Sequence, residues 1–269
     1  MKLFKFDVMK HEMHSVTPLS KTRAALFAQY KLRKHRERNG IFVAEGRKTI
    51  GDLLPTASPS SLVKAGDALL PEDWVPYLVG TEIFEATESQ MSKITTLSTA
   101  PDYYAVFPLP LRKEYDGKGL EPDLYLMLDG VQDPGNLGTI VRTAHWFGIK
   151  TIFASRDTVD IFNPKTIMAT MGSLGHADVI YCNLREVVTA NPEFPVYGLL
   201  LDGEDIYKAD LGKAGFIVMG NEGNGISASM RNAVTSPLLI PPGNKKDHGE
   251  SLNVAIATAV TLSQFRSRL

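Results

Sequence analysis

Three segments in the second half of the chain each couple an apolar, strand-like run to a turn rich in glycine or proline. They cover residues 128–144, 218–226 and 240–254, and the first and third then continue into helix-like patterns. Turns at the ends of strands are where α/β proteins bind their ligands. Three such turns in one stretch of chain predict an α/β domain with a binding site to which all three contribute.

From residue 124 onward, apolar runs alternate with helix-like segments. Runs that are apolar throughout predict strands buried on both faces. Their alternation with helices is typical of a largely parallel sheet covered by helices on both sides. The expected strands are residues 124–128, 151–154, 179–181, 196–201, 216–219 and 238–240, and the expected helices include 137–146, 165–172 and 251–265.

The first half of the chain predicts a smaller α/β unit. A basic helical stretch follows Ser20, and a polar, turn-rich linker follows the unit. The expected strands are 40–44, 77–79 and 104–107, the expected helices include 45–54 and 89–96, and 55–61 is expected to be a loop. The predicted domains are an N-terminal extension (1–20), a small domain (21–108), a linker (109–122) and a larger domain (123–269).

The net charge of -1 hides an asymmetry along the chain. Residues 1–50 hold 12 Lys and Arg against 4 Asp and Glu, so the N-terminal part is strongly basic. A basic face suits a polyanion such as RNA, although the same pattern also fits a solvated helix face. The candidate RNA-contacting residues form the densest basic stretch, Lys31, Arg33, Lys34, Arg36 and Arg38.

What the chain lacks disfavours several classes of protein. Cys182 is the single cysteine, which excludes an internal disulfide framework and fits a reducing compartment. Lysines interrupt the N-terminal region too often for a signal peptide, and no run approaches the ~18 apolar residues of a membrane helix. No spacing of histidine and cysteine suggests a metal site. We therefore expect a soluble, cytoplasmic protein with no membrane partner and no metal.

In the first segment, Asp133 to Gly135 predict a tight turn, and Asn136 stands where the N-cap of the following helix is expected. The backbone N–H groups of such a helix start can bind a carboxylate or a phosphate. Arg142 follows on an apolar background, where a guanidinium usually has a dedicated anionic partner. That partner could be a ligand or simply an acidic side chain of the protein.

The second segment places three glycines within six residues, from Gly220 to Gly225, directly after an apolar strand. Glycines let the backbone pass close to a ligand or to another segment of the chain. Their spacing differs from the dinucleotide-binding fingerprint, and the chain has no phosphate-binding loop of the NTPase type. Glu222 in this loop could bind a ligand, or it could be an exposed acid in a turn.

The third segment couples a strand end at Ile240 to a helix opened by Ser251 and Asn253, which could be capping residues. Residues 254–260 are unusually small, which indicates close packing against another helix or a dimer partner. A polar insert over residues 244–249 separates the strand from the helix. This insert could touch RNA, or it could be a solvated loop.

Taken together, the three segments resemble the three sequence motifs of the SpoU (TrmH-like) branch of the SPOUT RNA methyltransferases. The matching residues are 136–142, 219–225, and Ile240-Pro with 251–254, and the resemblance covers about residues 124–266. One departure is that the loop after Pro242 is longer than usual. The small domain is similar to the RNA-binding domain of the ribosomal protein L30e type that often precedes the methyltransferase domain.

The resemblance implies methyl transfer from S-adenosylmethionine to a ribose 2′-oxygen of RNA. It also implies an α/β domain with a deep trefoil knot, a rare exception to unknotted topology, and a homodimer formed through that domain. The cofactor is expected among the loops of the second and third motifs. By resemblance, the cofactor-binding residues are Met219, Gly220, Asn221, Gly225, Ile240 and Leu252.

By the same resemblance, Arg142 matches the family's catalytic arginine, and Asn136, Glu222, Ser251 and Asn253 match its other polar site positions. The methyl group on a sulfonium is already activated, so the reaction depends on aligning the reacting atoms rather than on a metal. Arginine is a poor base because its pKa lies above ~12. We therefore expect Arg142 to bind the adjacent phosphate and to stabilise the developing alkoxide.

The sequence leaves the RNA target and two other functions open. An L30e-like domain suggests a structured target, which favours ribosomal RNA over transfer RNA. A catalytically silent, knotted RNA-binding protein is one alternative, and the intact set of polar site residues argues against it. A nucleotide-dependent oxidoreductase is another, and the glycine spacing argues against that.

Overall fold

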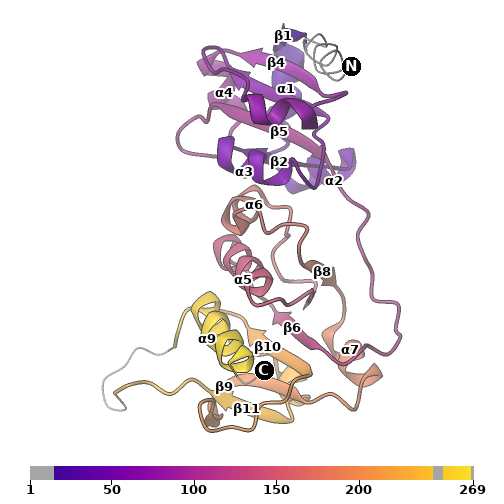
Figure 1. The fold of residues 1–269 in the computed structure, drawn as a ribbon, viewed down its shortest axis with the longest axis vertical. Helices are drawn as coiled ribbons and strands as arrows, with labels where there is room; N and C mark the ends of the chain where they lie inside the picture. Colours follow the sequence, from indigo (N-terminus) through magenta and orange to yellow (C-terminus); the bar gives the residue numbers. More distant parts are fainter. Residues whose placement is uncertain (1–14, 245–250, 268–269) are drawn as a thin grey trace, which may run out of the picture. The chain divides into compact units, whose positions relative to one another are not determined.

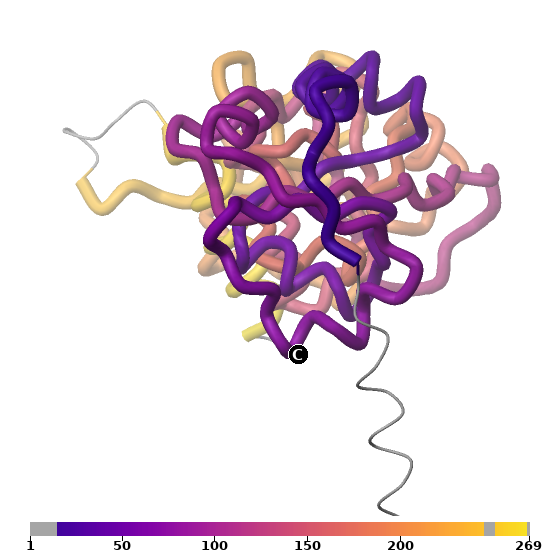
Figure 2. The backbone as a smooth tube through the Cα atoms, turned by 90° about the horizontal axis from the view of Figure 1, so that it is seen from above, coloured from indigo at the N-terminus to yellow at the C-terminus, as the bar shows by residue number. Residues whose placement is uncertain are grey.

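The computed structural model describes residues 15–244 and 251–267, and Figure 1 shows its helices and strands. The chain divides into two compact units, Met1–Leu109 and Pro110–Leu269. Figure 2 follows the path of the same backbone in a second view. Each unit has a sheet and a buried core of its own. In the part of the chain that is described, no helix is long and apolar enough to cross a membrane.

The first unit is built on a mixed five-stranded sheet. Its strands are β1 (Val16–Pro18), β2 (Ile41–Glu45), β3 (Ser61–Ala65), β4 (Glu82–Ala86) and β5 (Tyr103–Pro108), in the spatial order β1-β4-β3-β5-β2. β5 runs antiparallel to β2 and β3, whereas the other pairs are parallel. Its helices are α1 (Lys21–Gln29), α2 (Arg33–Asn39), α3 (Arg47–Leu53), α4 (Glu88–Ile94) and the 3-10 helix η1 (Glu72–Tyr77).

Side-chain caps set the starts of the helices that cover this sheet. The Ser20 hydroxyl accepts the backbone N–H of Arg23 at 3.2 Å and so caps α1. Thr87 and Gln90 form a reciprocal capping box at the start of α4. Both caps satisfy N–H groups that have no partner within the helix.

The prediction of a strand over residues 77–79 is wrong. This region belongs to η1 and the turn after it, and Leu78 is fully buried as a packing residue rather than as part of a ladder. Pro76 has no backbone N–H, which suits a turn better than a sheet. The actual strands are β4, which has only two apolar residues between Glu82 and Glu85, and β3, which begins where a loop was expected to end.

The second unit is built on a six-stranded sheet in which every described pairing is parallel. All six strands expected from the apolar runs are present. They are β6 (Leu124–Asp129), β7 (Thr151–Ala154), β8 (Asp178–Tyr181), β9 (Val196–Asp205), β10 (Gly215–Gly220) and β11 (Ser236–Leu239), in the order β11-β9-β10-β6-β7-β8. The helices are α5 (Pro134–Trp146), α6 (Pro164–Thr170), α7 (Leu184–Ala190), α8 (Ala228–Arg231) and α9 (Val254–Arg266).

The helix α5 contains the matching residues of the first motif and packs against both α6 and α9 (Figure 1). Its contact with α6 is close enough to require a glycine at position 138. A Cβ at Gly138 would lie 2.5 Å from the Ala169 Cβ and 2.5 Å from the Thr166 carbonyl oxygen. At the other side, the Arg266 Nε donates to the Phe147 carbonyl oxygen at 2.6 Å and fixes the end of α9 against the end of α5.

Candidate functional site

The turns of the first two motifs lie side by side because β6 and β10 are neighbouring parallel strands. Gly220, the last residue of β10, pairs with Asp129, the last residue of β6. The Asn221 side-chain amide donates to the Gly130 carbonyl oxygen at 2.7 Å and ties the two turns together. Parallel strands present their carboxyl ends at one edge of a sheet, and this edge carries the site.

Three of the candidate catalytic side chains form one hydrogen-bonded group, which we call the polar triad (Glu222, Asn136 and Asn253). The Asn253 Nδ2 donates to the Asn136 Oδ1 at 2.9 Å, and the Asn136 Nδ2 donates to the Glu222 Oε1 at 3.0 Å. Glu222 also accepts the backbone N–H groups of Gln132 and Asp133 at 3.2 Å each. Each of the three motifs contributes one side chain to the triad.

The hydrogen bonds keep Glu222 in its charged form. Burial acts to raise the pKa of Glu222, but the Asn136 amide and the backbone N–H groups of Glu222, Gln132 and Asp133 together hold the pKa below the ordinary 4.5. An ionised carboxylate only accepts hydrogen bonds, so Asn136 must turn its NH2 toward Glu222. Its carbonyl oxygen then faces Asn253, and the charge on Glu222 thereby fixes the orientation of both amides.

Asn253 is the N-cap of α9, as expected. Its Oδ1 accepts the backbone N–H groups of Ala255 and Ile256 at 2.9 and 3.3 Å. The expectation that Asn136 caps α5 is wrong, because Asp133 holds that position and accepts the N–H of Asn136 at 2.8 Å. Pro134 favours the first helical position, so the helix begins earlier than expected and the Asn136 side chain is left for the triad.

The glycine loop of the second motif is held rigid by its own hydrogen bonds. Asn221 and Gly225 exchange backbone hydrogen bonds of 2.8 and 2.9 Å. The Asn221 Oδ1 also accepts the N–H groups of Gly223 and Asn224 at 2.9 Å each. At Gly220 a Cβ would lie 2.3 Å from the Gly225 carbonyl carbon, so no other residue fits there. The shape of the loop is therefore set by its own residues.

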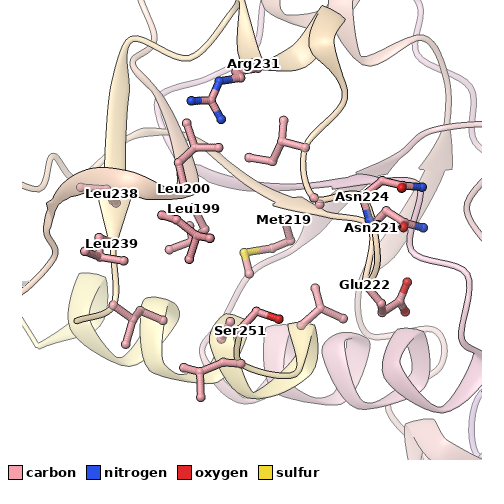
Figure 3. Close-up of a pocket in the computed structure, with 18 of the residues that line it drawn as sticks. Leu199, Leu200, Met219, Asn221, Glu222, Asn224, Arg231, Leu238, Leu239 and Ser251 are labelled. Atoms are coloured by element: carbon pink, nitrogen blue, oxygen red, sulfur yellow. Dashed lines mark hydrogen bonds between the residues drawn. The ribbon is translucent and has the colours of Figure 1, made fainter. Parts of the chain in front are cut away.

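A pocket of about 780 Å³ opens beside this loop. All six candidate cofactor-binding residues line it, as does Ser251. Sequence reasoning did not assign Leu199, Leu200 and Leu201, in the middle of β9, to the pocket, although they belong to an expected strand. Figure 3 shows the leucines Leu199, Leu200, Leu238 and Leu239 on one side of the pocket and Asn221, Asn224 and Glu222 on the other.

Among the described residues, Arg142 makes no hydrogen bond to the polar triad. It is exposed on α5 and does not line the large pocket. Within the described ranges its guanidinium makes no ion pair or hydrogen bond, so a structural pairing with an acidic side chain is not seen there. The residues Lys245, Lys246 and His248 of the polar insert lie outside the described residues.

The basic stretch of the first unit lies mostly on its surface. Lys31, Arg33, Lys34 and Arg38 are exposed, and the Arg33 Nε pairs with Glu37 at 2.8 Å. The inclusion of Arg36 among the RNA contacts is wrong. Arg36 is 3% exposed, and its guanidinium donates to the carbonyl oxygens of Tyr30 and Lys31 at 3.0 and 3.1 Å, so it fixes the turn before α2.

The described residues hold no group of three or more His, Cys, Asp or Glu side chains placed to bind a metal ion. The single cysteine, Cys182, is half-buried at the end of β8. Burial, with a smaller contribution from Glu186, raises the pKa of the Cys182 thiol to about 11. The thiol is therefore protonated at neutral pH and is not an activated nucleophile.

We predict that Glu222→Gln lowers the stability of the protein at neutral pH and that this loss shrinks on acidification. Because the folded-state pKa of Glu222 is depressed, its contribution is present above the unfolded-state pKa and is lost as the pH falls through the folded-state pKa. Urea unfolding from neutral pH to below 4.5 measures the difference. The control Glu193→Gln removes an exposed carboxylate. A difference for Glu222→Gln that stays constant over this range would contradict the prediction.

Known proteins match both units of the chain. Residues 123–263 match the SpoU rRNA Methylase family, and residues 26–105 match the MRM3-like substrate binding domain. The 23S rRNA (guanosine(2553)-2′-O)-methyltransferase RlmP of Bacillus subtilis is 30% identical over 239 residues, which is 87% of this chain and 92% of that protein.

Solved structures are similar over nearly the whole chain. A TrmH-family protein from Porphyromonas gingivalis has a TM-score of 0.77 and 36% identity, covering 93% of this chain and 99% of that one. The AdoMet-bound rRNA methyltransferase from Sinorhizobium meliloti has a TM-score of 0.78 and 29% identity, covering 95% and 98%. With its three motifs gathered at one edge of a parallel sheet, the chain belongs to the SpoU rRNA methylase family.

Proposed function

We propose that this protein transfers a methyl group from S-adenosylmethionine to a ribose 2′-oxygen of ribosomal RNA. The observation that carries the proposal is the polar triad, which unites one side chain from each motif next to a large pocket. Two relatives support the assignment of ribosomal RNA and S-adenosylmethionine as the substrates. The Bacillus subtilis relative is named as a 23S rRNA 2′-O-methyltransferase, and the Sinorhizobium meliloti relative is AdoMet-bound.

The large pocket fits the chemistry of S-adenosylmethionine. Its leucines offer an apolar wall for a purine, and its asparagines and backbone groups offer hydrogen bonds to polar atoms. When bound, this cofactor supplies a methyl group already activated by the sulfonium. We assign its binding to Met219, Gly220, Asn221, Gly225, Ile240 and Leu252, all of which line the pocket.

The triad and Arg142 divide the remaining work. Glu222 is an acceptor held in its charged form, so it orients Asn136 and, through it, Asn253. These amides, with the Ser251 hydroxyl, would orient the ribose and keep its 2′-hydroxyl aligned for attack. Arg142 is permanently charged and exposed. It would hold the neighbouring phosphate and stabilise the developing alkoxide.

We also infer that the second unit is knotted and acts as a homodimer. Support for a dimer comes from large apolar side chains left in solvent on neighbouring helices. Trp146 at the end of α5 is 85% exposed, and Ile256 in the first turn of α9 is 53% exposed. The two side chains lie toward opposite ends of the packed helices, so an interface that covers both would run along α5 and α9. The small residues of α9 would allow close helix packing across it.

We predict that Arg142→Ala lowers kcat by at least about 10²-fold, as does loss of a side chain that stabilises developing charge. S-adenosylmethionine affinity should stay unchanged, because Arg142 does not line the pocket. Single-turnover methylation and calorimetry measure the two quantities. Lys150→Ala removes an exposed charge just beyond α5 and is the control. Loss of cofactor binding together with activity would show that the role assigned to Arg142 is wrong.

The substrate is tested by nucleoside mass spectrometry of ribosomal and transfer RNA from cells with and without the gene. Loss of a 2′-O-methylated nucleoside from ribosomal RNA is expected, and guanosine is the first to examine, given the name of the Bacillus subtilis relative. Loss from transfer RNA instead would assign the transfer RNA alternative. A wild-type protein that binds RNA but no S-adenosylmethionine would be a silent RNA-binding protein.

We predict that Ile256→Glu shifts the protein from dimer to monomer in sedimentation velocity, since a charge would be buried in the interface. Val79→Glu places the same charge on a side chain that is 70% exposed in the first unit, and it should leave the dimer intact. Methylation should fall when the dimer is lost, because the resemblance to the family implies a site built from both chains. A wild-type protein that is monomeric at the concentration of the assay would contradict the inference.

We predict that replacing Lys31, Arg33 and Lys34 together by Gln weakens RNA binding, most strongly at low salt. The slope of log affinity against log salt should fall by about 1 for each phosphate that the variant no longer binds. Filter binding over a salt series measures this slope. Lys93→Gln, on the exposed side of α4, is the control. An unchanged affinity and slope in the triple variant would remove this stretch from the RNA surface.

A further inference from the structure

A second pocket, of about 460 Å³, opens at the same carboxyl edge of the sheet in the second unit. It lies at the ends of β6, β7 and β8, where Asp129, Ser155 and Cys182 line it. The glycine loop and its continuation form the wall between the two pockets. Residues 220–226 line the large pocket, whereas Ser227 and Met230 line the second one.

The strand order makes this pocket a natural ligand site. The chain passes from β6 outward to β7 and β8 on one side, whereas β10, β9 and β11 lie on the other side of β6. The order of strands therefore reverses beside β6. In open parallel sheets, ligands bind outside the carboxyl ends of the strands at such a reversal.

Two arginines face this pocket from different elements. Arg156 follows β7 and Arg185 stands in the first turn of α7, and both are exposed. Within the described part of the chain, neither guanidinium forms an ion pair or a hydrogen bond. Two guanidinium groups that converge on one pocket are suited to a phosphate, whose oxygens match their planar donors.

The inner wall holds a carboxylate that is nine-tenths buried. Asp129 is 9% exposed, and its Oδ2 accepts the backbone N–H of Ser227 at 2.7 Å. Among the described residues, its Oδ1 accepts no hydrogen bond. A carboxylate can accept about four hydrogen bonds, and a buried one is costly unless it is satisfied. The Asp129 Oδ1 is not among the fully buried atoms that lack a partner, so it stays open to the pocket, where an N–H of a ligand can reach it.

The charges in the pocket exclude a simple anion as its whole ligand. Glu186 also lines the pocket, and its Oε1 accepts the Asn183 Nδ2 at 3.0 Å. Two arginines thus face two carboxylates, so a bare phosphate would gain no net attraction. A ligand that carries a phosphate at one end and N–H donors at the other would satisfy both the arginines and Asp129. A nucleotide has this combination, because the base edges carry amino and imino N–H groups.

We propose that this second pocket binds one nucleotide of the substrate RNA. Arg156 and Arg185 hold its phosphate, and the Asp129 Oδ1 accepts an N–H from its base. The proposal rests on RNA being the substrate, and it adds an RNA contact within the catalytic unit itself. Because the glycine loop is the shared wall, a nucleotide held here is one flanking the position that is methylated.

The test compares Arg156→Gln/Arg185→Gln with the control Lys150→Gln/Lys213→Gln. The control removes two exposed charges next to the amino ends of β7 and β10, at the opposite edge of the sheet. The variant loses charge-assisted hydrogen bonds to a phosphate, so it should bind RNA at least about tenfold more weakly. Its salt slope should fall by about 1, and KM for RNA should rise with little change in kcat.

S-adenosylmethionine affinity, measured by calorimetry, should be unchanged in both double variants. Unchanged RNA affinity in the arginine variant overturns the proposal, and so does a parallel loss of cofactor affinity, which would mean that the arginines support the glycine loop. Asp129→Asn is a second test, of the contact with the base. The variant keeps an acceptor for the Ser227 N–H but presents an N–H donor to the base in place of an acceptor. Its RNA affinity should fall while its cofactor affinity holds.

These outcomes stay separate from failure of the proposed function. RNA affinity is measured by filter binding whether or not methyl transfer occurs. A wild-type protein that binds RNA without methylating it contradicts the proposed function, and the arginine variant still decides whether the second pocket holds a nucleotide.

Discussion

The parallel pairing of β6 with β10 is the interaction on which the rest of the site depends. It places residues more than eighty positions apart in the sequence at one edge of the sheet, with Gly220 opposite Asp129. The register matters as much as the pairing, because a shift of one residue would turn every side chain of a strand to the other face. In the observed register, the Asn221 amide of the second turn can donate to the Gly130 carbonyl oxygen of the first.

Once these turns are neighbours, the charge on Glu222 orders the polar groups around it. The carboxylate accepts only, so it fixes Asn136, and Asn136 fixes Asn253 at the start of α9. The same Asn253 caps that helix, so the orientation of the site and the start of a packed helix are set by one side chain. A preorganised arrangement of this kind avoids reorganisation during the reaction.

The sequence predicted the larger unit better than its site or the smaller unit. Its six strands were predictable because buried parallel strands read as uninterrupted apolar runs. The β4 strand of the smaller unit was not predictable, because Glu82 and Glu85 leave only two apolar residues between them. The motif residues were identified by resemblance, but the hydrogen bonds of the triad join residues 86 and 117 positions apart, and no local pattern encodes them. Arg36 misled for the same reason, since a basic stretch does not reveal which arginine folds back onto carbonyl oxygens.

The rigidity of the glycine loop determines whether ligands in the two pockets on either side of it affect each other's binding. Coupling between two ligands requires that each bias a structural element with two arrangements. The backbone exchange between Asn221 and Gly225, the amide of Asn221 and the tight contact at Gly220 leave this loop one arrangement. A glycine loop with one arrangement cannot make binding in one pocket change the affinity of the other. The two pockets should therefore bind their ligands with nearly independent free energies, and the loop contributes by fixing their separation.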